Sequence, residues 1–228
     1  MPEPIRIASL NVKRLGARER PRAARIGAFV RELQSDVVAL QEIGEEAAHD
    51  VAAHAGMAHV TFVGHALSGR RGVALLHRAP AITSSGVRIA ARVGDDKGFT
   101  RAVLRFGDRE REIVGMHLDW LSRRARLVQI ERIARALGAP SIPRVALGDL
   151  NAMTLRTWAR GETADETVIA LALALGVRTP GKTSPTFPSH APRWALDWVL
   201  ASPELGLSEI EVVPTALSDH AAIVAEVG

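Results

Sequence analysis

The sequence predicts an α/β protein, and two observations carry this prediction. In the first third of the chain, short apolar runs typical of buried strands alternate with segments in which apolar residues recur at helical spacing. After Pro80, strand-like segments follow one another with short connections, which favours antiparallel hairpins. The 228 residues contain no segment that resembles a linker, so we expect a single domain over residues 1–228.

Hydrophobic period and turn residues place the individual elements. Helices are expected where apolar residues such as Ile26, Val30 and Leu33 share one face, or where an apolar run ends at a glycine such as Gly176. In chain order, these helices cover residues 20–34, 45–55, 122–137 and 168–175. Strands are expected at residues 5–12, 37–42, 59–63, 72–76, 86–90, 100–106, 111–116, 145–149, 194–200 and 221–227, with Asp197 inside the strand at 194–200.

Composition excludes several classes of protein. Hydrophobic residues make up 47% of the chain and charged residues 24%, which is ordinary for a globular protein with a sizeable core. The absence of cysteine excludes disulfides, thiolate zinc sites and cysteine nucleophiles. The amino terminus lacks the apolar stretch of a signal peptide, and no run reaches the roughly 20 apolar residues of a membrane span. We therefore expect a cytoplasmic protein without a transmembrane segment, and separately we expect a monomer.

The stretch from residue 145 to residue 152 is the most informative one for function. It is an apolar run that delivers Asp149 and Asn151 to the carboxyl end of a buried strand. Residues two apart on an extended segment point to the same side, so both side chains can address one ligand. The alternative is that Asp149 caps the next helix and Asn151 occupies a turn, and this stretch alone leaves both open.

Hard oxygen ligands and imidazoles recur at the ends of strands that are distant in the sequence. Because strands in a common core end together, and ligand sites of α/β sheets lie beyond those ends, this recurrence predicts one polar cleft. Carboxylates and amides without thiols suit Mg²⁺ or Mn²⁺, and metal-assisted phosphoryl transfer is the matching chemistry. Taken singly, each residue is more often a turn or cap residue. The set comprises Asn11, Glu42, His117, Asp149, Asn151, Asp197, Asp219 and His220.

Six short motifs along the chain resemble those of the endonuclease/exonuclease/phosphatase superfamily, also called the deoxyribonuclease-like fold. Each motif is weak alone, but all six in this order are specific. The resemblance implies a four-layer α/β sandwich, in which two mixed, mostly antiparallel sheets pack face to face with helices outside. The motifs are SLNV at residues 9–12, LQE at 40–42, GMHL at 115–118, GDLN at 148–151, LDWV at 196–199 and SDH at 218–220.

The resemblance also implies roles for these residues. Glu42 would be the principal metal ligand, with Asn11 beside it and Asp219 contributing directly or through a water molecule. Asp149 and Asn151 would position and activate the attacking water. His220 would contact the phosphate as a charged donor or act as the base, Asp197 would fix the tautomer of His220, and His117 would lie on the opposite side of the phosphate. One departure is Ala195, where many relatives have an arginine that supports the site.

Three functions remain possible from the sequence. We favour a divalent-metal-dependent phosphodiesterase or phosphatase for a small molecule or a phospholipid headgroup. The alternatives are a Mg²⁺-dependent DNA endonuclease or exonuclease and, less favoured, a non-catalytic phosphate-binding module. Nucleic acid is a possible but not a favoured partner, since a net charge of +4 is small and we interpret the arginine-rich helix, which includes Arg123, Arg126 and Arg135, as a solvated face.

Overall fold

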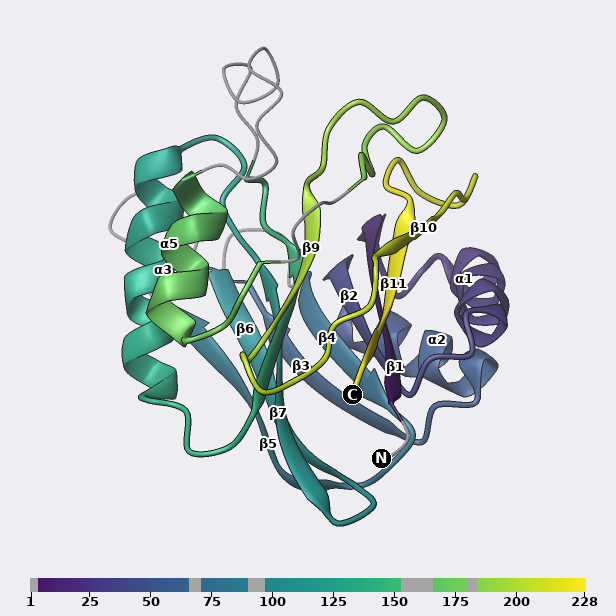
Figure 1. Cartoon of the computed structure of the whole chain (residues 1–228). Helices are drawn as coiled ribbons and strands as arrows, with labels where there is room; N and C mark the ends of the chain where they lie inside the picture. The colour runs from purple at the N-terminus through teal and green to yellow at the C-terminus, as the bar shows by residue number, and fades with distance from the viewer. Residues whose placement is uncertain (1–3, 66–70, 90–96, 153–165, 180–183) are drawn as a thin grey trace.

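The computed structural model describes residues 4–65, 71–89, 97–152, 166–179 and 184–228. Within them, two β-sheets pack against one another and helices cover both outer faces (Figure 1). The helices are α1 Arg20–Glu32, α2 Glu45–Ala55, α3 Arg123–Leu137 and α5 Glu166–Leu175. The strands are β1 Ile5–Leu15, β2 Val37–Ile43, β3 His59–Gly64, β4 Gly72–His77, β5 Ala81–Ile89, β6 Lys97–Phe106, β7 Arg109–His117, β8 Arg144–Asp149, β9 Asp197–Ala201, β10 Glu211–Val213 and β11 Ala222–Val227.

Both sheets are mixed. The six-stranded sheet has the order β10-β11-β1-β2-β4-β3, and the five-stranded sheet has the order β5-β6-β7-β8-β9. The pairs β1–β2 and β7–β8 are parallel, and the other pairs named in the two sheets are antiparallel. The expected four-layer sandwich of mixed, mostly antiparallel sheets is therefore confirmed.

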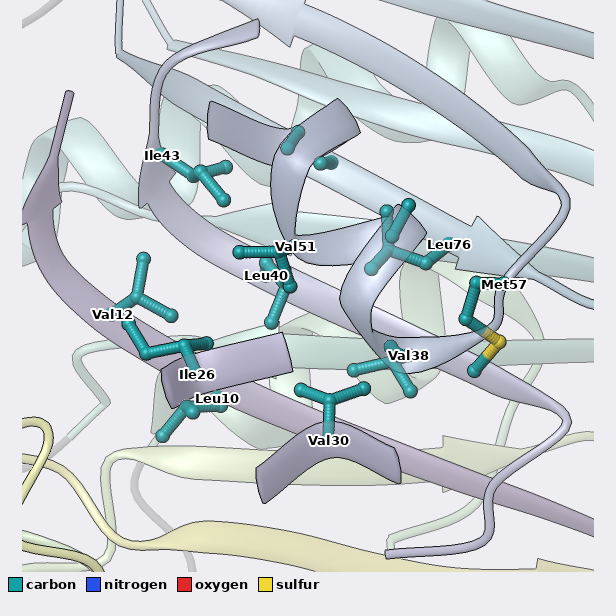
Figure 2. Close-up of a cluster of buried hydrophobic side chains, with 14 of the residues drawn as sticks. Leu10, Val12, Ile26, Val30, Val38, Leu40, Ile43, Val51, Met57 and Leu76 are labelled. Carbon is teal, nitrogen blue, oxygen red and sulfur yellow. The ribbon is translucent and has the colours of Figure 1, made fainter. Parts of the chain in front are cut away.

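Helices α1 and α2 cover the outer face of the six-stranded sheet. Alternate residues of β1, among them Leu10 and Val12, point toward these helices and belong to one fully buried cluster with Ile26 and Val30 of α1 (Figure 2). Full burial of each such aliphatic side chain stabilises the fold by about 2 kcal/mol. This packing holds the carboxyl ends of β1 and β2 in place beneath the helices.

The other residues of these strands, which alternate with those that face the helices, point into the layer between the sheets. In β1 this row contains Ile7, and in β8 it contains Val145 and Leu147, all fully buried in the inter-sheet cluster. Because strand side chains repeat every two residues, Asn11 continues the row of Ile7 and Asp149 continues the row of Val145. Both polar residues therefore reach the same inter-sheet space, Asn11 where the regular pairing of β1 with β2 stops and Asp149 at the last residue of β8.

Helices α3 and α5 cover the outer face of the five-stranded sheet, where Ile130 of α3 and Leu171 of α5 share a third cluster. The interpretation of the α3 arginines as a solvated face is wrong for Arg126, which is 4% exposed. Arg126 lies one turn before Ile130 on the buried face, and its guanidinium donates to Thr167 Oγ1 and to the Asp119 carbonyl. None of the helices in the described part of the chain is long and apolar enough to cross a membrane.

Several strand boundaries differ from expectation, and β1, β6 and β7 are longer than expected. The strand expected at 86–90 begins at Ala81, and the short strand β10 was not expected at all. The strand expected at 194–200 begins only at Asp197, because Trp194 instead forms an isolated bridge with Phe187. Asp197 is thus the first residue of β9 rather than an interior one, which places its carboxylate at the edge where the parallel strands end.

Candidate active site

A cavity of about 580 Å³ lies at the edge of the sandwich where β1, β2, β7 and β8 end and where β9 and β11 begin. Antiparallel β9 and β11 contribute the residues at their starts, so starts and ends of strands converge on one edge. Asp197 does not line the cavity but lies buried behind His220. The seven other predicted site residues line it: Asn11, Glu42, His117, Asp149, Asn151, Asp219 and His220.

Asn11 joins the two sheets at this edge. Its amide nitrogen donates to Asp149 Oδ2 over 2.9 Å and to Glu42 Oε1 over 3.3 Å. Its amide oxygen accepts the backbone N–H of Lys13 over 2.9 Å, which fixes the orientation of the side chain. Asn11 is 1% exposed, so one buried amide holds two carboxylates from different sheets at a fixed separation.

Strained backbone is concentrated around the cavity. Among the described residues, five that are not glycine have positive φ, and four of them line the cavity: Lys13 at 47°, Arg14 at 57°, Glu42 at 59° and Asn151 at 47°. Each such conformation costs about 1–3 kcal/mol and persists only where the surroundings enforce it. The pairing of β1 and β2 also shifts register at this point, so the strands leave regular geometry where they reach the cavity.

Asp149 is the central carboxylate of the cavity. Its Oδ1 accepts the backbone N–H of Asn151 over 2.9 Å, and its Oδ2 lies 3.6 Å from His117 Nε2 and 3.8 Å from His220 Nε2. Burial raises the pKa of Asp149 to about 6; His220 opposes this shift and Asp197 reinforces it. Gly148 permits this placement, because a side chain there would meet the Met116 carbonyl oxygen at 2.0 Å.

Asp197 and His220 form a buried pair. His220 Nδ1 lies 2.8 Å from Asp197 Oδ2, and the Thr186 hydroxyl donates to the same oxygen over 2.6 Å. Burial alone lowers the pKa of His220, but the negative charges of Asp197 and Asp149 outweigh it and raise the pKa to about 10. The imidazole is therefore held as a cation with Nε2 toward the cavity, and sequence reasoning missed Thr186 because one threonine in a loop carries no pattern.

His117 has the opposite electrostatic character. Burial, followed by the positive charge of Lys97, lowers the pKa of His117 well below its ordinary value, so the imidazole is neutral. Its ring lies 6.2 Å from that of His65, whose pKa burial lowers to about 3. Within the described residues, His117 Nδ1 and His65 Nε2 have no hydrogen-bond partner. The cavity thus combines one neutral and one charged imidazole, and His65 was not expected from the sequence.

The loop before β11 is fastened to the end of β1. The Ser218 hydroxyl donates to the Asn11 carbonyl over 2.5 Å, and Asp219 Oδ2 lies 3.1 Å from Lys13 Nζ. Arg22 of α1 adds a second connection, because its guanidinium donates to the carbonyl oxygens of Val12, Lys13 and Leu217. These contacts fix Asp219 and His220 relative to Asn11 although more than 200 residues separate them in the sequence.

Aromatic side chains form another wall of the cavity. The rings of Phe187 and Trp194 stack with centroids 5.8 Å apart, and Phe187 lies 4.9 Å from the His220 ring. Six further residues line the cavity, and sequence reasoning assigned none of them to the site, although Leu196 belongs to the motif at residues 196–199. The additional lining residues are Lys13, Arg14, Trp120, Phe187, Trp194 and Leu196.

Two sets of oxygen and nitrogen donors could hold a metal ion. Ligand atoms of Asp149, Asp197 and His220 lie within 4.8 Å of one another and form a buried group of suitable size. The other set is the one expected from the sequence, in which Glu42 stands beside Asn11 with Asp219 on the same cavity wall. Both sets contain hard donors without sulfur, which fits a divalent cation such as Mg²⁺ or Mn²⁺.

The comparisons with known proteins agree with this architecture. No curated protein matches the sequence significantly. Solved structures that superpose over nearly the whole chain include an endonuclease/exonuclease/phosphatase from Bacteroides vulgatus, with a TM-score of 0.79, 17% identity and coverage of 99% of this chain and 98% of that one. Two others are a mannosyl-6-phosphatase from Bacteroides thetaiotaomicron (0.75, 13%, 98% and 99%) and a sphingomyelinase C from Streptomyces griseocarneus (0.72, 18%, 98% and 99%).

Sequence identities this low show only a shared fold. The family of the chain therefore has to come from its own sequence. The sequence model of one family matches residues 8–220, which begin within β1 and end at His220. This span contains the six motifs and the eight predicted site residues, from Asn11 to His220. The chain belongs to the endonuclease/exonuclease/phosphatase family.

Proposed function

We propose that the protein is a divalent-metal-dependent hydrolase of phosphate esters, acting on small phosphodiesters or phosphomonoesters, including phospholipid headgroups. The observation that carries this proposal is the meeting of Asn11, Glu42 and Asp149 in one cavity with the Asp197–His220 pair. A module that merely bound phosphate would use cationic groups alone, whereas the carboxylates of Glu42 and Asp149 would repel a phosphate unless a cation lay beside them. The arrangement suits hydrolysis better than retention.

Glu42 with Asn11 and Asp219 would hold Mg²⁺ or Mn²⁺. When bound, such an ion neutralises charge on the phosphoryl oxygens and stabilises the leaving oxygen. The donor set fits, because the Glu42 carboxylate lines the cavity and, among the described residues, accepts a side-chain hydrogen bond from the Asn11 amide alone. The Asp149–Asp197–His220 group fits less well, since a protonated imidazole has no free lone pair to offer a metal.

The remaining residues would transfer protons and stabilise the negative charge of the phosphate. Asp149, with its raised pKa, accepts a proton from the attacking water, which Asn151 helps to position. His220 donates a charge-assisted hydrogen bond from Nε2 to a phosphoryl oxygen, and Asp197 holds its protonated form through Nδ1. Neutral His117 offers its Nε2 to the other side of the phosphate. Of the two roles expected for His220, the raised pKa favours the charged donor over the base.

The substrate class is inferred from the cavity and from similar structures. Trp120, Phe187, Trp194 and Leu196 give the cavity an apolar wall suited to a compact leaving group. Among the similar structures are a mannosyl-6-phosphatase and a sphingomyelinase C, whose names indicate a sugar phosphate and a phospholipid. Duplex DNA is less favoured, since the net charge of +4 is small for holding a polyanion.

A panel assay with Mg²⁺ at physiological salt tests the proposal. The substrates are bis(p-nitrophenyl) phosphate, p-nitrophenyl phosphate, glycerophosphocholine, sphingomyelin vesicles and supercoiled plasmid, each assayed with the wild type and with His220→Ala as the control for contaminating activity. We expect turnover of at least one small ester or headgroup to exceed plasmid nicking. Nicking that exceeds all of them, and that falls steeply as salt rises, would identify a nuclease instead.

A further inference from the structure

The cavity has a cationic rim at a bulge in β1. Between Asn11 and Leu15 the pairing of β1 with β2 shifts register, and Lys13 and Arg14, which lie in this interval, have φ values of 47° and 57°. Both side chains line the cavity. A strand that kept its regular alternation would direct two successive side chains to opposite faces, so the bulge is what brings both cations to one rim.

The surroundings hold this bulge in its strained form. The Lys13 backbone N–H donates to Asn11 Oδ1 over 2.9 Å, and Arg22 donates to the carbonyl oxygens of Val12 and Lys13. Two adjacent left-handed residues that are not glycine cost about 1–3 kcal/mol each. A surface arginine that served only solubility would need neither the strained backbone nor the hydrogen bonds that hold it.

The two cations of the rim differ in what they contact. Lys13 Nζ lies 3.1 Å from Asp219 Oδ2, so its charge already has a partner. Arg14 is exposed, and within the described residues its guanidinium has no hydrogen bond or ion pair. The backbone of Arg14 is therefore fixed at the cavity while its planar set of donors is free to bind an anion in a bidentate manner.

We propose that Arg14 forms a second anion subsite, which selects substrates that carry a carboxylate or a second phosphate next to the ester that is cleaved. The inference rests on the proposed function, because the first phosphate must sit at His220 and Asp149 for the second group to reach the rim. It narrows the substrate class from phosphate esters in general to those with another negative charge on the alcohol.

Two matched probes separate the subsite from the phosphate site. Propylphosphonate carries only the phosphonate, and 3-phosphonopropionate adds a carboxylate in place of the methyl group. Their dissociation constants are measured by isothermal titration calorimetry with Mg²⁺ present, using the wild type, Arg14→Gln, Arg14→Lys and Arg18→Gln. Arg18 is an exposed arginine on the same segment that does not line the cavity, so Arg18→Gln matches the charge change. Mg²⁺ binds the probes in solution to the same extent in all four titrations, so this effect cancels when the proteins are compared.

We expect the wild type and Arg18→Gln to bind 3-phosphonopropionate about tenfold more tightly than propylphosphonate, a ratio typical of one charge-assisted pair. Arg14→Gln should lose this ratio with little change for propylphosphonate, and Arg14→Lys should keep part of it. An unchanged ratio in Arg14→Gln, or no preference in the wild type, would overturn the subsite and leave the phosphate site standing. Failure of both probes to bind the wild type would overturn the subsite and the proposed function together.

Discussion

Asn11 donates an amide N–H to Asp149 over 2.9 Å, and the two residues belong to different sheets. The same amide nitrogen reaches Glu42, so a neutral group lies between two carboxylates. Without such a donor between them, the two carboxylates would repel one another more strongly. Asn11 therefore keeps both of them available for a cation and for a water molecule, and it does so from the first strand of the chain.

Asn11→Asp should reveal this role in thermal denaturation. The change places a third negative charge between Glu42 and Asp149, so in the presence of a chelator the variant should be less stable than Asn11→Ala, by about 1–3 kcal/mol. Added Mg²⁺ or Mn²⁺ should raise the Tm of Asn11→Asp more than that of the wild type, because an extra carboxylate strengthens a cation site. Equal stability of the two variants, both with and without divalent cations, would contradict this role of Asn11.

Asp197 and His220 should act as one unit in catalysis. Because Asp197 holds the protonated imidazole through Nδ1, removing His220 leaves Asp197 with nothing to support. The double alanine variant should thus be hardly slower than His220→Ala, in turnover measured on the best ester of the panel. Losses that multiply would instead show that Asp197 contributes independently, and Tm values for the three variants would separate that case from simple unfolding.

The buried histidines predict how stability depends on pH. The pKa of His65 falls from 6.5 in the unfolded chain to about 3 in the folded protein. Its buried neutral form therefore costs no stability above pH 6.5, and the protein loses stability as the pH falls from 6.5 toward 3. The pKa of His220 rises to about 10, so its contribution is full below pH 6.5 and is lost as pH rises toward 10. Each difference of one proton changes the free energy of unfolding by about 1.4 kcal/mol per pH unit.

Urea unfolding of the wild type and His65→Gln at several acidic pH values tests the first of these contributions. The variant lacks one titrating group, so its free energy of unfolding should fall less steeply below pH 6.5, while shared groups such as Asp149 cancel in the comparison. Parallel curves for the two proteins would show that His65 titrates alike in the folded and unfolded chains.

The sequence predicted much of this arrangement because the underlying signals are periodic. Asn11 and Asp149 follow apolar runs whose parity decides which way their side chains point, and strands that share a core end at one edge. The same reasoning misplaced the start of β9, since a run that contains Asp197 does not show where pairing begins. Periodicity thus predicts well toward which face a side chain points, and predicts poorly where a strand begins or ends.

Other features could not be predicted because they depend on contacts between distant segments. Arg126 resembles its solvated neighbours in the sequence, and only the position of Thr167 and the Asp119 carbonyl makes its burial tolerable. The strain at Lys13 and Arg14 has no local signature either, since glycine is absent from the bulge. Neither feature is visible until α1, α3 and α5 are packed against the sheets.

The most direct measurement of the central claim compares wild type and Glu42→Gln across Mg²⁺ and Mn²⁺ concentrations, on whichever small ester the panel identifies. Glutamine keeps the shape of Glu42 and removes its charge, so turnover should fall by about two or more orders of magnitude, with partial recovery at high metal concentration. The wild type should lose activity in excess chelator and regain it when metal is restored. Full activity of the wild type in excess chelator, or of Glu42→Gln at low metal concentration, would contradict the account.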